Sequence, residues 1–250
     1  MLAITRRTVI KNLLQEQKSV TITDLAARLN VTKETIRRDL RVMENAQELI
    51  RTHGGAYILE GVQNDIDIST RQDLKTDEKE ILAEKCNALI QPGDIIFLDS
   101  STTAWFLARK ILERNLTVLT PSLEIANILN GSSSIHLFLI GGEYSQNSRS
   151  FTGPGAARAL GNYYIDKAFL SPRSVSLEYG LTDTNEDTAL LHQVALEHAK
   201  ETYIVVDHSK LDKISFSSVA PLEKITGIVL DSPFSREWQA KLSQKNVACY

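Results

Sequence analysis

Basic and hydroxyl side chains recur over residues 32–41 at a spacing that suits contact with DNA. If this segment is a helix, its outward side chains are Lys33, Thr35, Arg37, Arg38 and Arg41. Lys and Arg near a helix start bind phosphate oxygens and guanine edges, and Thr contacts a base edge or a thymine methyl. The residue types therefore predict a helix that enters the major groove. Taken alone, they also fit the solvated face of a surface helix.

Two short helices joined by a tight turn are expected to position these side chains. Thr23 can cap the first helix and Thr32 the second, while Asn30 and Val31 turn the chain between them. Both threonines are counted with the DNA-binding residues. The inward positions of the pair are apolar: Leu25, Ala26 and Leu29, then Ile36, Leu40 and Met43. A preceding helix over residues 4–16 supports the pair with Ile4, Val9, Ile10, Leu13 and Leu14.

An extended run with a glycine pair follows at residues 49–58 and predicts the hairpin of a wing. Arg51 and His53 would meet the sugar-phosphate backbone or the minor groove. This context favours DNA binding over the interpretation as a solvated helix face.

Small polar residues follow four apolar segments that are expected to be strands. The first set, Asp99 to Thr103, ends a strand and starts a helix, so backbone N–H groups, the helix dipole and hydroxyls together suit an anion. A simple helix cap explains this set equally well. The other three sets are Thr120-Pro121-Ser122, Gly141-Gly142 and Asp207 to Lys210. Each alone fits a plain turn or a surface ion pair, but ligands of open α/β sheets bind at such strand ends.

Alternating helices and strands predict a mostly parallel sheet covered on both faces. Helices are expected at residues 77–90, 103–112, 123–129 and 186–200. Strands are expected at residues 95–98, 117–119, 135–140, 167–170, 203–206 and 225–230. The fold class is α/β, with a winged helix-turn-helix over residues 1–58, a linker over 59–75 and a larger domain over 76–250.

Charge and composition fit this division. Residues 1–56 hold ten Lys and Arg against six Asp and Glu, although the whole chain has a formal net charge of −3. A basic head on an acidic body fits DNA binding by one end. The sequence has no long apolar run and no apolar segment behind its first charges, so we expect a cytoplasmic protein without a membrane span or signal peptide. Cys86 and Cys249 are expected to be reduced, and neither a metal site nor a cofactor is expected.

The motifs resemble those of the DeoR family of bacterial transcription regulators. The resemblance lies in V-T-K-E-T-I-R-R-D-L, in R-T-H-G-G-A and in the four polar turns, with Arg71 and Lys79 at matching positions, and it spans nearly the whole chain. The segment D-S-S-T-T-A-W-F-L-A-R is most similar to the fucose-operon activator branch. One departure is Gln47-Glu48, where the family has a glycine near the wing; Gln47 can adopt a left-handed conformation there.

The resemblance implies a larger domain similar in fold to ribose-5-phosphate isomerase, which binds a phosphorylated sugar. Ser100, Ser101, Thr102 and Thr103 would hold the phosphate. The sugar side would be lined by Asp99, Ser122, Gly141, Gly142, Asp207 and Lys210. Ser101 replaces a family glycine and Pro121 an asparagine, while Thr188 and His192 replace a glutamate and a lysine, so ligand preference is expected to differ.

These features predict a transcription regulator of a carbohydrate-utilisation operon that binds double-stranded operator DNA and a phosphorylated sugar. Two DNA-binding domains are needed to read an operator with repeated or palindromic half-sites, so a homodimer or homotetramer is expected. The alternative is an isomerase-like enzyme with a DNA-binding head, which needs a carboxylate base. The stretch from Asp166 to Arg173 offers no acid after its strand, with Asp166 expected before it. A third class, a purely structural DNA-binding protein, predicts no stabilisation by sugar phosphates.

Overall fold

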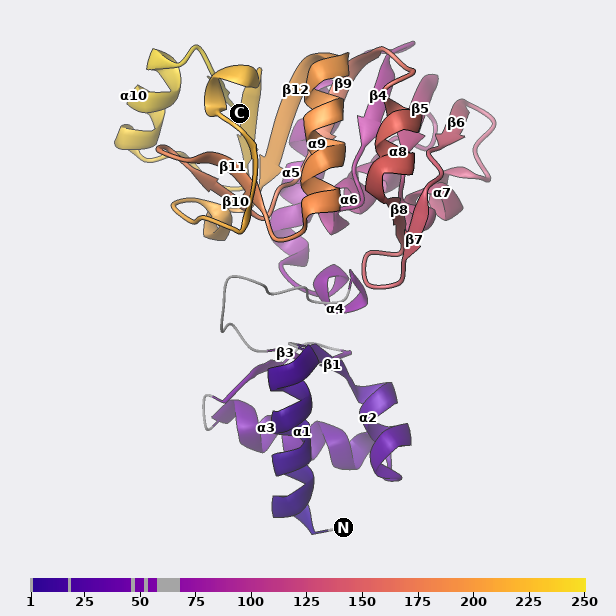
Figure 1. Ribbon diagram of the computed structural model, residues 1–250, viewed down its shortest axis with the longest axis vertical. Coiled ribbons are helices and arrows are strands. Elements are labelled where there is room, and N and C mark those ends of the chain that lie inside the picture. Colours follow the sequence, from indigo (N-terminus) through magenta and orange to yellow (C-terminus); the bar gives the residue numbers. More distant parts are fainter. Residues whose placement is uncertain (1, 18, 46–47, 52–53, 58–67) are drawn as a thin grey trace. The chain divides into compact units, whose positions relative to one another are not determined.

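The computed structural model describes residues 2–17, 19–45, 48–51, 54–57 and 68–250 (Figure 1). These residues form two compact units that divide between Thr76 and Asp77. The first part of the expected linker lies outside the described residues. Its later part contains helix α4 (Ile68–Gln72), in which Ile68 is fully buried. The sequence does not predict this helix, because a single apolar residue among polar neighbours gives no helical period.

The smaller unit has three main helices and a three-stranded antiparallel sheet of order β1-β3-β2. Its remaining elements are α1 (Ala3–Gln17), β1 (Ser19–Thr21), α2 (Ile22–Leu29), α3 (Lys33–Asn45), β2 (Ile50–Arg51) and β3 (Gly55–Tyr57). The predicted inward positions of α2 and α3 are all buried. In α1 the prediction is wrong for Ile4, which is 74% exposed, because the first turn of the helix extends beyond the core. Arg6, one half-turn later, is buried instead.

Strand β1 was not expected, and it explains one glycine of the wing. Thr21 of β1 lies opposite Gly55 of β3. A Cβ atom at Gly55 would lie 2.0 Å from the carbonyl oxygen of Val20, so no larger residue fits without displacing a strand. The predicted hairpin itself is confirmed by the pairing of Arg51 with Ala56.

The larger unit is built on seven parallel strands in the order β15-β14-β12-β9-β4-β5-β6, which confirms the predicted class. The strands are β4 (Ile95–Leu98), β5 (Leu116–Thr120), β6 (Ile135–Leu139), β9 (Ile165–Leu170), β12 (Ala199–Val206), β14 (Gly227–Leu230) and β15 (Ala248–Cys249). Helices cover both faces: α5 (Thr76–Leu89), α6 (Thr102–Lys110), α7 (Leu123–Leu129), α8 (Gly153–Leu160), α9 (Glu186–His198) and α10 (Arg236–Gln244).

Successive residues of each central strand point to opposite faces of the sheet and so supply two cores. Ile96 and Leu98 of β4 pack with residues of α5, α6 and α7. Phe97 between them packs on the other face with residues of α8, α9 and α10. Figure 1 shows α9 across the near face of the sheet, with α5 and α6 behind it. Burial on both faces explains why these strands appear in the sequence as continuous apolar runs.

Smaller elements complete the unit and were not expected. Two antiparallel sheets, β7-β8 and β10-β11-β13, flank the main sheet. Their strands are β7 (Glu143–Ser145), β8 (Ser150–Thr152), β10 (Ser174–Ser176), β11 (Gly180–Asp183) and β13 (Ser217–Ala220). Two short 3-10 helices are η1 (His208–Lys210) and η2 (Leu222–Lys224). Strands of three or four residues, rich in serine, carry too little alternation to be found by pattern.

Candidate functional site

Helices α2 and α3 form the predicted two-helix unit. The turn between them passes through Asn30, whose φ of 49° is left-handed, and the N–H of Val31 donates to Ala26 O at 3.0 Å. Asparagine tolerates this conformation better than most residues, which explains its place here. Thr32 caps α3, because its Oγ1 accepts from the Thr35 N–H at 3.2 Å. The turn and the second cap are therefore confirmed.

The predicted cap of α2 is wrong by two residues. Thr21, not Thr23, precedes the helix in an extended conformation, and its Oγ1 accepts from the Asp24 N–H at 3.1 Å. Thr23 lies exposed inside the first turn. The sequence Thr-Ile-Thr-Asp offers two candidate caps, and the burial of Ile22 as the first helical residue selects the earlier one.

Helix α3 exposes the basic side chains expected to face DNA. Lys33, Arg37, Arg38 and Arg41 are exposed and Thr35 is half-buried. Arg37 forms an ion pair with Glu34 one turn earlier, at 3.4 Å between Nη1 and Oε2. Such an exposed pair holds its partners weakly, so the guanidinium stays available to a phosphate.

In the wing, Arg51 has a structural contact that the sequence does not indicate. Its Nε lies 3.1 Å from Glu44 Oε2, and its N–H donates to Glu44 Oε1. The wing is thereby tied to the end of α3. His53 and Gln47 lie outside the described residues, so their predicted roles stay predictions.

In the larger unit, the strand order reverses between β4 and β9. From β4 the chain proceeds to β5 and β6 on one side, and then returns to add β9, β12, β14 and β15 on the other. In open parallel sheets, ligands bind outside the carboxyl ends of the strands at such a switch point. A ligand site is therefore expected at the residues that follow β4 and β9.

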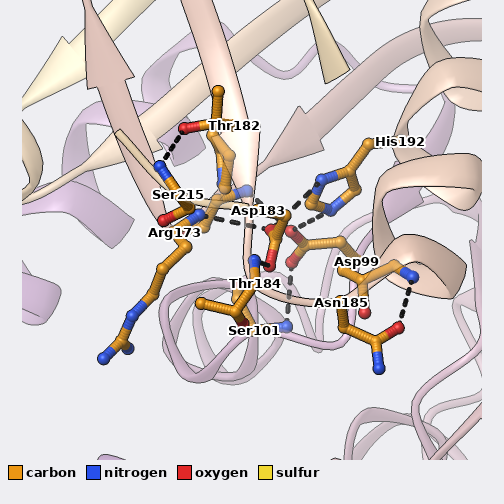
Figure 2. A network of polar contacts seen from close by, with 12 residues as sticks. Asp99, Ser101, Arg173, Thr182, Asp183, Thr184, Asn185, His192 and Ser215 are labelled. Atoms are coloured by element: carbon orange, nitrogen blue, oxygen red, sulfur yellow. Dashed lines mark hydrogen bonds and ion pairs between the residues drawn. The ribbon is translucent and has the colours of Figure 1, made fainter. Parts of the chain in front are cut away.

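Asp99, directly after β4, is the centre of a buried polar network at that point (Figure 2). Its Oδ1 accepts from the Ser101 N–H at 2.9 Å. Its Oδ2 accepts from the Ser171 N–H after β9 at 2.6 Å and lies 3.1 Å from His192 Nε2 of α9. The side chain that was expected to line a sugar thus also joins three segments of the fold.

The first turn of α6 carries the expected hydroxyl residues. Ser101 caps the helix, since its Oγ accepts from the Ala104 N–H at 3.0 Å. Thr102 and Thr103 are buried in this turn, and Ser100 is half-buried. The cap gives the Ser101 side chain a structural role at the start of α6. It also means that the two interpretations of this turn, cap and anion site, are compatible.

Lys210 reaches the same edge of the sheet from η1. Its Nζ donates to Ser171 Oγ at 2.8 Å and to Pro172 O at 3.0 Å. Asp207 caps η1 by accepting from the Ser209 N–H at 3.1 Å. Ser171 therefore links Lys210 to Asp99, which brings the first and fourth polar turns together.

The second and third turns belong to the neighbouring strands β5 and β6. Ser122 is buried and caps α7 by accepting from the Ile125 N–H at 3.3 Å. A Cβ at Gly142 would lie 2.7 Å from Thr152 O and from the Ala156 side chain, so this glycine permits close packing of α8. Gly141 is exposed and has open space around its Cα. Structural reasons thus account for Ser122 and Gly142 without a ligand.

A second carboxylate, Asp183, was missed by the sequence analysis. It ends β11, where its Oδ1 accepts from the Thr184 N–H and its Oδ2 from the Arg173 N–H. Its Oδ2 also lies 3.8 Å from His192 Nδ1. The available signal was a polar residue at a strand end, as for Asp99, but β11 itself is too short to detect.

The expected position of Asp166 is also wrong. It lies within β9, not before it, and its Oδ2 accepts from the Ile95 N–H at 2.8 Å. This bond satisfies the first N–H of β4, so Asp166 has a structural role at the opposite edge of the sheet.

Ionisation in the network follows from these contacts. Burial opposes the charge of Asp99, but the hydrogen bond and charge of His192 outweigh it and lower the pKa of the carboxyl. Burial likewise opposes the charge of His192, but Asp99 and then Asp183 outweigh it and raise the pKa of the imidazole. Burial lowers the pKa of Lys210 to about 8, against the attraction of nearby carboxylates.

Both units of the chain have relatives among known proteins. It matches the DeoR-like helix-turn-helix domain over residues 6–62 and the DeoR C terminal sensor domain over residues 74–232. It is 34% identical over 247 residues to the uncharacterized HTH-type transcriptional regulator YulB of Bacillus subtilis, with 99% of this chain and 96% of that protein covered. The lactose phosphotransferase system repressor of Staphylococcus aureus is 32% identical over 225 residues, or 89% of each chain. The chain belongs to the DeoR family of transcription regulators.

Among solved structures, ribose 5-phosphate isomerase A from Methanocaldococcus jannaschii matches 54% of each chain with 20% identity and a TM-score of 0.41. Within the part of the chain that the structure describes, no helix has both the length and the apolar character needed to cross a bilayer. In the same residues, no three His, Cys, Asp or Glu side chains are arranged so that they could hold a metal ion.

Proposed function

We propose that this protein regulates a carbohydrate-utilisation operon by binding operator DNA with residues 1–58 and a phosphorylated sugar in the larger unit. The observation that supports effector binding is that Asp99, the start of α6 and Lys210 lie together at the switch point of the sheet. Membership of a regulator family supports the DNA half, and the lactose-system repressor among the relatives supports the carbohydrate connection.

At the DNA, α3 would enter the major groove and the wing would contact the backbone. The exposed cations of α3 supply counter-charges to phosphates, and the half-buried Thr35 is close enough to the helix start to reach a base edge. The proposed contacts are Thr23, Thr32, Lys33, Thr35, Arg37, Arg38, Arg41, Arg51 and His53.

At the effector, the start of α6 would bind the phosphate. Ser101 O accepts from the Trp105 N–H and Ser101 Oγ from the Ala104 N–H, so the N–H groups of Thr102 and Thr103 are those that can donate to an anion. Lys210 adds a cation. The proposed ligand residues are Asp99, Ser100, Ser101, Thr102, Thr103, Ser122, Gly141, Gly142, Asp207 and Lys210.

Two copies would be required to read an operator with repeated or palindromic half-sites, so the active form is proposed to be a homodimer or homotetramer. Effector binding would shift the oligomer between states that bind DNA tightly and weakly. The opposing hypothesis is sugar-phosphate isomerisation, and measurable turnover of pentose or hexose phosphates by the purified protein would favour it over regulation.

The central test measures binding of the full chain to its own promoter region by fluorescence anisotropy at 50–200 mM salt. Contacts to about six or more phosphates should lower affinity by roughly 10³-fold or more over this range. Ribose 5-phosphate, glucose 6-phosphate and fructose 1-phosphate are then tested for thermal stabilisation of the protein and for a change in promoter affinity. Equal affinity for random DNA, or no response to any phosphorylated sugar, would contradict the proposal.

Replacing Arg37 by Ala is expected to weaken promoter binding by about 10-fold or more, because a charge-assisted contact contributes about 1.5–3 kcal/mol. Thermal stabilisation by the sugar phosphate should be unchanged.

Thr102→Ala should weaken thermal stabilisation by the sugar phosphate and leave promoter binding unchanged, because it removes a hydroxyl from the proposed phosphate site at the start of α6. Arg158→Ala, an exposed arginine on α8, is the matched control for loss of one positive charge. If Arg37→Ala and Thr102→Ala each abolished both activities in folded protein, the division of roles would be refuted.

A further inference from the structure

His192 is a buried imidazole held between two buried carboxylates from different parts of the larger unit. It is only 2% exposed. Its Nε2 lies 3.1 Å from Asp99 Oδ2 and its Nδ1 lies 3.8 Å from Asp183 Oδ2. Figure 2 shows the ring pointing between the two acids. Asp99 follows a strand of the main sheet and Asp183 ends a strand of the small β10-β11-β13 sheet, so this contact spans two sheets.

Backbone N–H groups hold the two carboxylates in place independently of His192. Asp99 accepts from the N–H groups of Ser101 and Ser171, and Asp183 accepts from those of Thr184 and Arg173. Neither acid can turn away from the ring without losing these bonds. A neutral imidazole has one N–H and can donate to only one of the acids, whereas an imidazolium presents a donor toward each.

One atom in this group is unsatisfied. His192 Nδ1 is buried and has no hydrogen-bond partner in the structure. A buried polar atom without a partner is costly, and a charge-assisted attraction to Asp183 at 3.8 Å offsets part of that cost only if Nδ1 carries a proton. The geometry therefore favours the protonated ring, which gives the three side chains a net charge of −1 in place of −2.

Charged groups facing the ring come from three elements. They are Asp99 after β4, Asp183 in β11 and Lys210 in η1, and the charge of Arg173 acts in turn on Lys210. Helix α8 and strand β13 also pack against α9, where they contribute apolar side chains such as Ala156 and Val219 to the common core. The two acids favour the proton on His192 and Lys210 opposes it.

We propose that His192 is a positioning residue whose proton holds Asp99 and Asp183 together and makes effector binding at this site pH-dependent. This inference rests on the proposed effector site. Loss of the proton would leave two negative charges beside an anionic ligand and remove the attraction that fixes Asp183. The affinity for a sugar phosphate should therefore fall as pH rises, by at most about tenfold per pH unit for one linked proton.

The same proton contributes to stability. The pKa of His192 is raised above the value of about 6.5 for an unfolded histidine. Its contribution to folding is therefore fully present below about pH 6.5 and is lost as pH rises through the raised value. Lys210 has the opposite effect on folding, because its pKa is lowered to about 8 and its desolvation penalty disappears at higher pH.

Histidine NMR on the full chain tests the proton without any ligand. The ring signals of ¹³C-labelled histidine are followed from pH 5 to 9, and the signal lost in His192→Gln identifies the residue. If that variant does not fold, replacement of the other four histidines by Gln identifies it by exclusion. We expect a midpoint above pH 6.5 that falls by about one pH unit in Asp183→Asn. Glu186→Gln removes an exposed acid from the same helix and should leave it unchanged.

Binding of ribose 5-phosphate, glucose 6-phosphate and fructose 1-phosphate from pH 7 to 9 tests the link to the effector. The phosphate stays dianionic over this range, since its second pKa is about 6. Lys210→Arg removes the titration of the lysine. If the affinity of this variant still falls as pH rises, and the fall is absent in Lys210→Arg/His192→Gln, the result supports the proposal. A midpoint at or below pH 6.5, or equal profiles for the two variants, would overturn it. Absence of binding to any of the three would instead count against the proposed function.

Discussion

Asp39→Ala is expected to destabilise the smaller unit by about 3–5 kcal/mol, which is enough to unfold it in a large fraction of molecules. Asp39 of α3 is 3% exposed and forms an ion pair with Arg6 of α1, itself 8% exposed. Removal of the acid breaks this buried ion pair and takes away the carboxylate that the Arg6 Nε contacts. The apolar contacts between α1 and α3 would then have to hold the two helices together without the ion pair, and we expect promoter binding to fall with the folded fraction of the unit.

The effect can be followed separately in the two units. Both tryptophans, Trp105 and Trp238, lie in the larger unit, so their fluorescence reports on that unit alone. Hydrogen exchange at the amides of α1 to α3 reports on the smaller one. We expect much faster exchange with unchanged fluorescence. Glu34→Ala is the control because it removes an acid from the same helix, but from an exposed ion pair that contributes little. Equal exchange in Asp39→Ala and Glu34→Ala would refute the argument.

The difference between Asp39 and Glu34 illustrates what the sequence could not provide. Helical period predicts that Ile36, Leu40 and Met43 face inward, and the structure confirms it. Asp39 lies on the same side, but an acid on a basic helix gives no indication that it is buried. Only the partner, 33 residues earlier in α1, explains its place. Patterns identify apolar faces well, whereas buried ion pairs depend on contacts that are distant in sequence.

The larger unit follows the same rule. Long apolar runs such as Ile95–Leu98 predict six of the seven strands of the main sheet, because burial on both faces leaves a strong compositional pattern, whereas the two-residue edge strand β15 was missed. The three-residue strand β10 and the four-residue strand β11 carry no such pattern and were missed. Asp183 was missed with them, although Asp99 at the end of a long strand was found. Thus the half of the site on the parallel sheet was predictable, and the half contributed by the small antiparallel sheet was not.

Local rules also fail where two residues compete for one role. Thr21 and Thr23 have equal capping ability, and the choice between them depends on the burial of Ile22 together with the pairing of Thr21 with Gly55 in a sheet that the sequence does not indicate. Asp166 is a similar case, since its bond to the Ile95 N–H depends on the adjacency of β4 and β9. In each case the role of the side chain depends on a residue that is distant in sequence and adjacent in space.

Replacing Lys210 by Met is expected to weaken binding of the sugar phosphate by roughly 10- to 150-fold, because a hydrogen bond to a charged group contributes about 1.5–3 kcal/mol. Lys210 Nζ bonds to Ser171 Oγ and Pro172 O, which hold the cation beside the network of Asp99. Met has a similar length and apolar stem, so the change removes the charge with little loss of packing. Promoter affinity without effector should stay near the wild-type value.

The pH dependence of binding provides a second measure of the same charge. The pKa of Lys210 is about 8, so the wild-type lysine loses its proton between about pH 7 and 9 and affinity for an anion should fall over that range. In Lys210→Met this part of the fall is absent and the profile becomes shallower. Lys213→Met, an exposed lysine three residues later, is the matched control and should retain the wild-type affinity and profile. Titration calorimetry at several pH values measures both quantities. If Lys213→Met weakened binding as much as Lys210→Met, the effect would come from the general charge of the loop, and Lys210 would not be the cation that holds the phosphate.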